Sequence, residues 1–224
     1  IKSKAQETSD GFVLNGVKRF ISNGHAANIM VAFFKTPLSD NPRAISAFVV
    51  EKGIQGFTIV KRLRMLAPHD MVELRFDNCW VPKENLLGKV VDGYKIATKT
   101  LEVFRMSVGA AAVGIGQAAF DLALNYTKKR VQFGSPIAKF QAIQFKLAEM
   151  ATELDAARGL VYRAAIMKDK GEANVSRQAS MAKFYATEVA FRAVDQGGQI
   201  HGCLGVTYGS AIERLYREIR ALRI

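Results

Sequence analysis

One stretch, residues 102–141, most constrains what this chain can fold into. Apolar residues recur in it at intervals of three and four, which predicts a long helix with one buried face. These positions are Val108, Ala111, Ala112, Ile115, Ala119, Leu122 and Ala123. Glycines at 109, 114 and 116 lie inside the pattern, although each glycine costs a helix up to about 1 kcal/mol relative to alanine. We therefore expect another backbone or a bulky ligand to pass very close to this helix.

The helix is expected to end at a basic cluster, Lys128 to Arg130, before a turn at Phe133, Gly134 and Pro136. Positive side chains at this place complement the negative end of the helix dipole. The alternative interpretation is that Arg130 is a fixed donor in an anion site. The residues alone leave both interpretations open.

Further helical patterns follow over about 138–170, about 175–197 and from residue 210 to the end of the chain. Ser210 and Glu213 have the spacing of a capping box, which marks a helix start. Four long antiparallel helices with short connections predict an up-down four-helix bundle. The glycines at 109, 114 and 116 lie within a helix, so they do not form a Rossmann fingerprint, and no P-loop is present.

Residues 1–87 have a strand pattern instead. Residues 11–22 predict a hairpin in which Asn15 and Gly16 form a type I′ turn. Apolar runs at 29–34, 45–50, 57–60 and 73–76 have the spacing of a β-sandwich or barrel. Turn residues separate them: Pro37, Pro42, Gly53, Gly56 and Pro68. We expect an α+β chain, with a small antiparallel β-sandwich or barrel domain at 1–87 and the helical bundle at 88–224.

The net charge of +12 favours partners rich in phosphate. The basic residues are dispersed and no RNP-type aromatic pattern accompanies them, so nucleic acid is only weakly indicated. We find no apolar run near the ~20 residues that span a bilayer. The two cysteines and three histidines have no metal-ligand spacing. Because the chain starts at Ile1 and stops inside a helical pattern, we interpret it as a fragment, and no targeting segment can be read.

Four blocks of sequence resemble a known family, in the same order and at similar distances. They are LNGVKRFISNG (14–24), LRFDNCWVPKENLLG (74–88), RMSVGAAAVGIGQAAFDLALNYTKKRVQFGSPIAKFQAIQFKLAEM (105–150) and QIHGCLG (199–205). The chain resembles the middle β domain and C-terminal helical domain of acyl-CoA dehydrogenases. The resemblance implies FAD held between these domains in a homotetramer, an acyl-CoA substrate and electron-transfer flavoprotein as acceptor. It places the protein in the cytoplasm or the mitochondrial matrix.

The resemblance also implies site residues. Phe20 matches an aromatic residue against the flavin ring, and Ser22 matches a hydroxyl near flavin N5. The implied cofactor-binding residues are Phe20, Ile21, Ser22, Arg130, Gln132, Phe133, Gln141, Gln199, Gly202 and Cys203. Arg130 suits the FAD pyrophosphate because its planar fork donates two charge-assisted hydrogen bonds. Cys203 stands where the family has a second glycine, and its side chain can crowd the cofactor.

Glu102, Phe104 and Arg105 match the helix wall that faces the substrate. A simple ion pair within the helix is the plainer interpretation of Glu102 and Arg105. The family places its catalytic glutamate either at the position of Phe104 or just beyond the segment that ends at Ile224. We therefore expect the base to be a glutamate a short distance beyond Ile224.

The resemblance leaves other functions to be weighed. An acyl-CoA oxidase-like member would pass electrons to oxygen, and a DNA-binding flavoprotein relative would use the net charge of +12 on nucleic acid. A flavin-free structural paralogue is a further alternative. A yellow protein that an acyl-CoA bleaches without oxygen selects the dehydrogenase, a colourless one favours the flavin-free paralogue, and salt-sensitive retention on DNA would support the DNA-binding relative.

Overall fold

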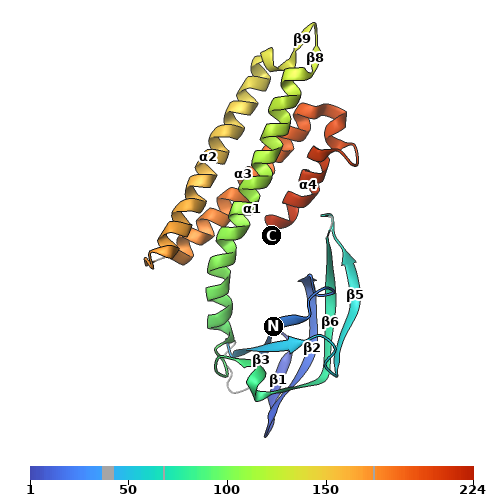
Figure 1. Cartoon of the computed structure of the whole chain (residues 1–224), viewed down its shortest axis with the longest axis vertical. Helices are drawn as coiled ribbons and strands as arrows, with labels where there is room; N and C mark the ends of the chain where they lie inside the picture. Colours follow the sequence, from blue (N-terminus) through green and yellow to red (C-terminus); the bar gives the residue numbers. More distant parts are fainter. Residues whose placement is uncertain (37–42, 68, 174) are drawn as a thin grey trace. The chain divides into compact units, whose positions relative to one another are not determined.

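The computed structural model describes residues 1–36, 43–67, 69–173 and 175–224. Two compact units divide the chain: residues 1–65 with 69–100, and residues 66–68 with 101–224. Figure 1 shows strands in the first part of the chain and long helices in the second. The predicted breaks at Pro37, Pro42 and Pro68 lie outside the described residues.

The first unit contains a seven-stranded sheet with the order β5-β6-β2-β1-β3-β4-β7. Its strands are β1 (Lys4–Glu7), β2 (Gly11–Ser22), β3 (Ile29–Lys35), β4 (Ile45–Glu51), β5 (Phe57–Arg64), β6 (Asp70–Pro82) and β7 (Leu86–Leu87). Neighbouring strands are antiparallel except for β1 and β3. The core of this unit is aromatic: Phe34 makes edge-on ring contacts with Phe48 and Phe76. The apolar runs that predict strands therefore supply the side chains that fill this core.

The predicted hairpin at residues 11–22 is wrong, because β2 is one continuous strand of 12 residues. Its whole length pairs with β6, from Gly11 opposite Pro82 to Ser22 opposite Met71. Asn15 and Gly16 form an irregularity in this pairing instead of a turn. A Cβ atom on Gly16 would lie 2.5 Å from the Cβ of Ser3. The glycine is thus required by the close passage of the chain before β1, which a local turn pattern does not reveal.

Four helices make up most of the second unit: α1 (Gly93–Lys129), α2 (Gln141–Asp169), α3 (Val175–His201) and α4 (Ala211–Leu222). Between α1 and α2 lie the short strands β8 (Val131–Gln132) and β9 (Ser135–Pro136) and a 3₁₀ turn, Ile137–Lys139. A second 3₁₀ turn, η3 (Gly202–Val206), follows α3. The capping box is confirmed, since the Glu213 amide donates to the Ser210 hydroxyl at 3.3 Å.

Two of the three glycines at 109, 114 and 116 mark a close approach between helices, as predicted. A Cβ on Gly116 would lie 2.6 Å from Leu154 of α2 and 3.1 Å from the Cα of Ala190 in α3. A Cβ on Gly109 would lie 3.1 Å from Val161. At Gly114 nothing lies within 4 Å. The closely approaching backbone is therefore α3, over the middle of α1.

Among the described helices, α1 is long and apolar enough to cross a membrane by length and composition alone. An 18-residue window has a mean hydropathy of 1.4, which corrects the expectation that no stretch approaches this limit. Of that window, 33% is buried, and buried residues of α1 such as Ala112 and Ala119 belong to the helical core. Packing in the core therefore accounts for one apolar face of this helix.

The predicted fold class is confirmed: an antiparallel-rich β domain precedes a domain of four helices. The boundary predicted near residue 88 falls between β7 and α1. The two compact units meet further along the chain, at residue 100, so the first turns of α1 pack with the sheet. Gly93 is part of this packing, since a Cβ there would lie 2.7 Å from the carbonyl oxygen of Ile45.

Candidate functional site

One end of the helical unit brings together two of the segments predicted to bind a cofactor. Tyr126, in the last turn of α1, stacks on His201, the last residue of α3, with ring centroids 4.4 Å apart. Arg130 directly follows α1, and Gln199 lies two residues before His201. His201 itself is buried, and its Nδ1 is 2.7 Å from the Gly197 carbonyl oxygen, so its ring holds the end of the helix.

The turn after α1 presents its predicted residues to solvent. Phe133 and Gly134 have positive φ angles of 50° and 76°, which close the short β8-β9 hairpin. This geometry leaves the Phe133 side chain 93% exposed. Arg130, Gln132 and Gln141 are exposed as well. Four side chains suited to stacking and polar contact thus lie on one short connection, free to contact a ligand or another chain.

A cavity of about 570 Å³ lies where α3, η3 and α4 meet. Its lining includes the predicted residues Gln199, Gly202 and Cys203, together with Asp195, Gly198, Gly205, Val206, Glu213, Tyr216 and Arg217. Gly202 has a φ of 61° and an open space where a Cβ would lie. Backbone can therefore approach a ligand closely here, and the exposed Cys203 stands beside it.

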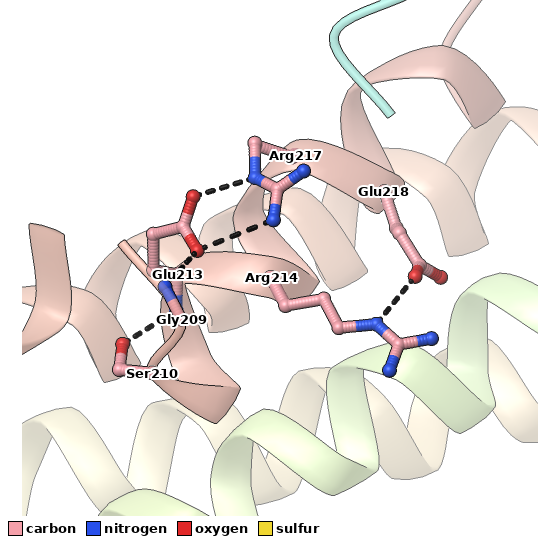
Figure 2. Close-up of polar contacts among 6 residues, drawn as sticks. All are labelled: Gly209, Ser210, Glu213, Arg214, Arg217 and Glu218. Atoms are coloured by element: carbon pink, nitrogen blue, oxygen red, sulfur yellow. Dashed lines mark hydrogen bonds and ion pairs between the residues drawn. The ribbon is translucent and has the colours of Figure 1, made fainter. Parts of the chain in front are cut away.

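An ion pair that the sequence analysis missed forms part of this cavity (Figure 2). Arg217 contacts Glu213 through Nε at 2.5 Å and Nη2 at 3.4 Å, and the Gly209 amide donates to the same carboxylate at 3.3 Å. The Arg217 hydrogen bond holds the pKa of Glu213 below its usual value, and Glu213 raises the pKa of Arg217. The spacing of four residues on a helix could have revealed this pair.

The predicted substrate residues of α1 make contacts between helices. Arg105 donates to the Ser180 hydroxyl of α3 at 3.1 Å, and Glu102 pairs with Lys168 of α2 at 3.5 Å. Each therefore has a partner on another helix, where the plainer interpretation had them pair with each other. Phe104 is 58% exposed.

The end of α4 lies in the same neighbourhood as Arg105. Lys183 of α3 donates to the backbone oxygen of Ile224 at 3.2 Å. Burial lowers the pKa of Lys183; Glu188 raises it and the positive charge of Arg105 lowers it further. Arg223 is held by two hydrogen bonds to Glu188, at 2.8 and 2.7 Å. Lys183 thus contacts the end of the chain and lies within electrostatic reach of Arg105.

The remaining predicted residues lie in the sheet unit, at the end of β2. Phe20 is 61% exposed, Ile21 is half-buried and Ser22 is exposed. Phe20 has a φ of 60°, which is an outlier for an aromatic residue. An aromatic ring and a hydroxyl are thus available to a ligand on this strand.

Metal ligands are a separate matter. Within the described part of the chain, no three His, Cys, Asp or Glu side chains lie close enough together to hold a metal ion.

Comparison with known proteins defines the class. The middle domain of acyl-CoA dehydrogenases matches residues 1–79, and the C-terminal domain of acyl-CoA dehydrogenases matches residues 91–224. The chain belongs to the acyl-CoA dehydrogenase family.

Individual relatives agree with this assignment. An acyl-CoA dehydrogenase of Bacillus subtilis is 44% identical over 226 residues, which cover 100% of this chain and 59% of the relative. A 3-(aryl)acrylate reductase of Clostridium sporogenes is 41% identical, over 100% of this chain and 60% of the relative. The structure of butyryl-CoA dehydrogenase from Megasphaera elsdenii superposes with a TM-score of 0.96 at 40% identity, over 100% of this chain and 59% of that one. The chain thus spans about three fifths of the length of the proteins it matches.

Proposed function

We propose that the whole protein is an FAD-dependent acyl-CoA dehydrogenase, which introduces a double bond between the α and β carbons of an acyl-CoA thioester. The observation that supports this most is the end of the helical unit, where the Tyr126–His201 stack joins the Arg130 turn to the Gln199 cavity. Family membership supports the same reaction. We place the domain boundary near residue 88.

The residues present fit a flavin dinucleotide. Arg130 is exposed and offers the planar fork that suits a diphosphate. Gly202 leaves open space at the wall of a cavity of about 570 Å³. On the sheet, Phe20 and Ser22 present a ring and a hydroxyl to solvent. These are the chemical groups that a ring system and a pyrophosphate require.

When bound, the flavin supplies the acceptor for the β hydrogen, which leaves the substrate as hydride while the α proton leaves to a base. The chain's own residues then have simple tasks. Phe20 covers the ring and keeps water away from it, and Ser22 donates a hydrogen bond beside N5. Arg130, Gln132, Phe133 and Gln141 hold the dinucleotide end of a cofactor across a subunit interface, together with Gln199, Gly202 and Cys203 of the same chain.

The base that we propose is a glutamate a short distance beyond Ile224. Phe104, at the other family position, has no group that accepts a proton. Lys183 donates a hydrogen bond to Ile224 and lies within electrostatic reach of Arg105. This supports a base that follows Ile224 and lies near the predicted substrate residues. Glu102 and Arg105 contribute to the substrate wall.

Relatives suggest the partners. One structural relative, with a TM-score of 0.95 and 43% identity, comes from a study of an electron transferring flavoprotein of Acidaminococcus fermentans. A caffeyl-CoA reductase-Etf complex subunit of Acetobacterium woodii is 39% identical. We propose an acyl-CoA substrate, electron-transfer flavoprotein as acceptor, and a homotetramer. We further propose that the protein works away from membranes, in the cytoplasm or the mitochondrial matrix.

The test uses the full-length protein. We expect it to be purified yellow, and we expect the visible absorbance of its flavin to bleach when a panel of acyl-CoAs is added without oxygen. A colourless protein that cannot be loaded with FAD contradicts the proposal. Flavin that is bleached by dithionite but by no acyl-CoA contradicts the substrate assignment.

A further inference from the structure

The strand that presents Phe20 contains a strained bulge. Lys18 pairs with Leu74 and Ile21 pairs with Val72, so β2 advances three residues while β6 advances two. The extra residue lies in the segment Arg19–Phe20, and Phe20 takes the positive φ of 60°. A non-glycine residue persists in this conformation only when its surroundings hold it there.

Lys18 holds the bulge on one side. Its Nζ donates to the carbonyl oxygen of Phe33 in β3 and lies 4.3 Å from the centre of the Phe34 ring. Phe34 is fully buried in the sheet core. The half-buried ammonium thus makes two contacts: a charge-assisted hydrogen bond to the carbonyl and a cation–π contact with the aromatic ring. Lys18 therefore ties the start of the bulge to a fixed part of the core.

Arg19 and Glu73 hold the other side. Arg19 Nε lies 2.8 Å from the Glu73 carboxylate of β6, and the Arg19 guanidinium lies 5.4 Å from the centre of the Phe20 ring. The Arg19 side chain is 57% exposed and that of Glu73 is 19% exposed, so water screens this pair in part and it supports the bulge less than the half-buried Lys18 does. Together the two links fix both the backbone of the bulge and the ring that projects from it.

We propose that Lys18 is a positioning residue, which fixes the bulge of β2 so that Phe20 and Ser22 meet the flavin in one orientation. The inference rests on the proposed function for the identity of the ligand. Lys18 touches neither flavin nor substrate in this account; it acts through the backbone of residues 19–22. The Arg19–Glu73 pair is a secondary support of the same bulge.

The test compares full-length Lys18→Met with Lys35→Met, an exposed lysine on β3. We expect Lys18→Met to fold but to alter the visible circular dichroism of the bound flavin and to slow its reduction by acyl-CoA between about tenfold and a hundredfold, the effect of a small misplacement. Lys18→Arg, which keeps a cationic donor, should recover part of the rate. Lys35→Met should match the wild type in all measurements.

Three outcomes separate the explanations. A wild type that binds no flavin contradicts the proposed function itself. A wild type that is active, with a Lys18→Met variant of unchanged flavin spectrum and reduction rate, overturns the inference. Lower thermal stability with unchanged flavin properties also overturns it, because Lys18 would then be merely structural. If Lys18→Met does not fold, Lys18→Gln, which is polar and uncharged, decides: a changed flavin dichroism with slower reduction supports the inference, and unchanged flavin properties overturn it.

Discussion

Tyr126 and His201 stack with their ring centroids 4.4 Å apart, and this contact joins the last turn of α1 to the last residue of α3. Arg130 lies four residues after the first ring and Gln199 two residues before the second. The contact therefore sets the separation between two segments that are proposed to hold one dinucleotide.

Replacing the Tyr126 ring tests whether the stack positions the Arg130 and Gln199 segments. We expect Tyr126→Leu to lower the free energy of unfolding by about 1 kcal/mol, the size of a stacking contact beyond its area, and to weaken FAD binding. Thermal unfolding and FAD titration of the full-length protein measure the two effects. Tyr162→Leu, on an exposed position of α2, is the matched control. Equal behaviour of the two variants contradicts the role of the stack.

Arg130 should contribute more to cofactor binding than its basic neighbours. Loss of a hydrogen bond to a charged group costs about 1.5–3 kcal/mol, so we expect Arg130→Met to raise the dissociation constant of FAD by about tenfold to a hundredfold. Arg130→Lys keeps the charge without the fork and should be intermediate. Lys129→Met serves as control. If Lys129→Met weakens FAD binding as much as Arg130→Met, Arg130 is only a helix-end charge.

Cys203 offers a gain-of-affinity test. The side chain lies on the wall of the cavity next to Gly202, which leaves open space. If the thiol crowds the cofactor, Cys203→Gly should bind FAD more tightly, and Cys203→Val should bind it more weakly. Equilibrium titration of the apoprotein with FAD gives both constants. The reverse order would show that the side chain makes a favourable contact.

The glycines of α1 predict opposite changes in stability. Gly116→Ala places a methyl group 2.6 Å from Leu154, and overpacking of this kind costs about 1–3 kcal/mol. At Gly114 nothing lies within 4 Å, so Gly114→Ala should stabilise the helix by up to about 1 kcal/mol. Denaturant unfolding of the two variants measures the difference. A stabilised Gly116→Ala variant would contradict the close approach of the helices.

Lys18 predicts a pH dependence of stability. Burial lowers its pKa from 10.5 to about 8. Between these two pH values the unfolded chain binds a proton that the folded chain has lost, so stability should rise with pH over this window. The free energy of unfolding of the wild type minus that of Lys18→Met isolates this contribution. We expect the difference to be constant below pH 8 and to grow from there to 10.5. A difference that is flat across the window contradicts the burial of Lys18.

The helices could be predicted from sequence because local periodicity and caps determine them. The capping box at Ser210 and Glu213 and the closely approached Gly116 are both visible in one stretch of residues. The sheet was harder. Asn15 and Gly16 have the local chemistry of a turn, but the glycine is required by Ser3 and the strand continues along β6. Contacts between residues distant in the sequence therefore determine that this segment is a strand and not a turn.

Some residues of the candidate site could likewise be predicted from the sequence, and others could not. The family pattern indicated the residues around Arg130 and Gln199, whereas no pattern indicated that Lys183 would contact Ile224 or that Lys18 would contact Phe33. Each of these lysines is one of many in a chain with 32 Lys and Arg residues. Only the fold distinguishes them, since their partners are backbone carbonyl groups, which have no signature in the sequence.

The continuity of α1 also restricts how this chain can be recombined with its relatives. The helix runs without interruption from Gly93 to Lys129, yet its first turns pack with the sheet and the rest with the other helices. A chimaera joined at residue 100 would keep each part of the helix with its own unit, but the junction would lie inside α1, where residues 93–100 of one parent continue directly into residues 101–129 of the other. A junction at Gly88, ahead of the helix, leaves all 37 residues of α1 from a single parent but sets its first turns, Gly93 included, against the other parent's sheet, so neither junction exchanges the two units without creating a new contact.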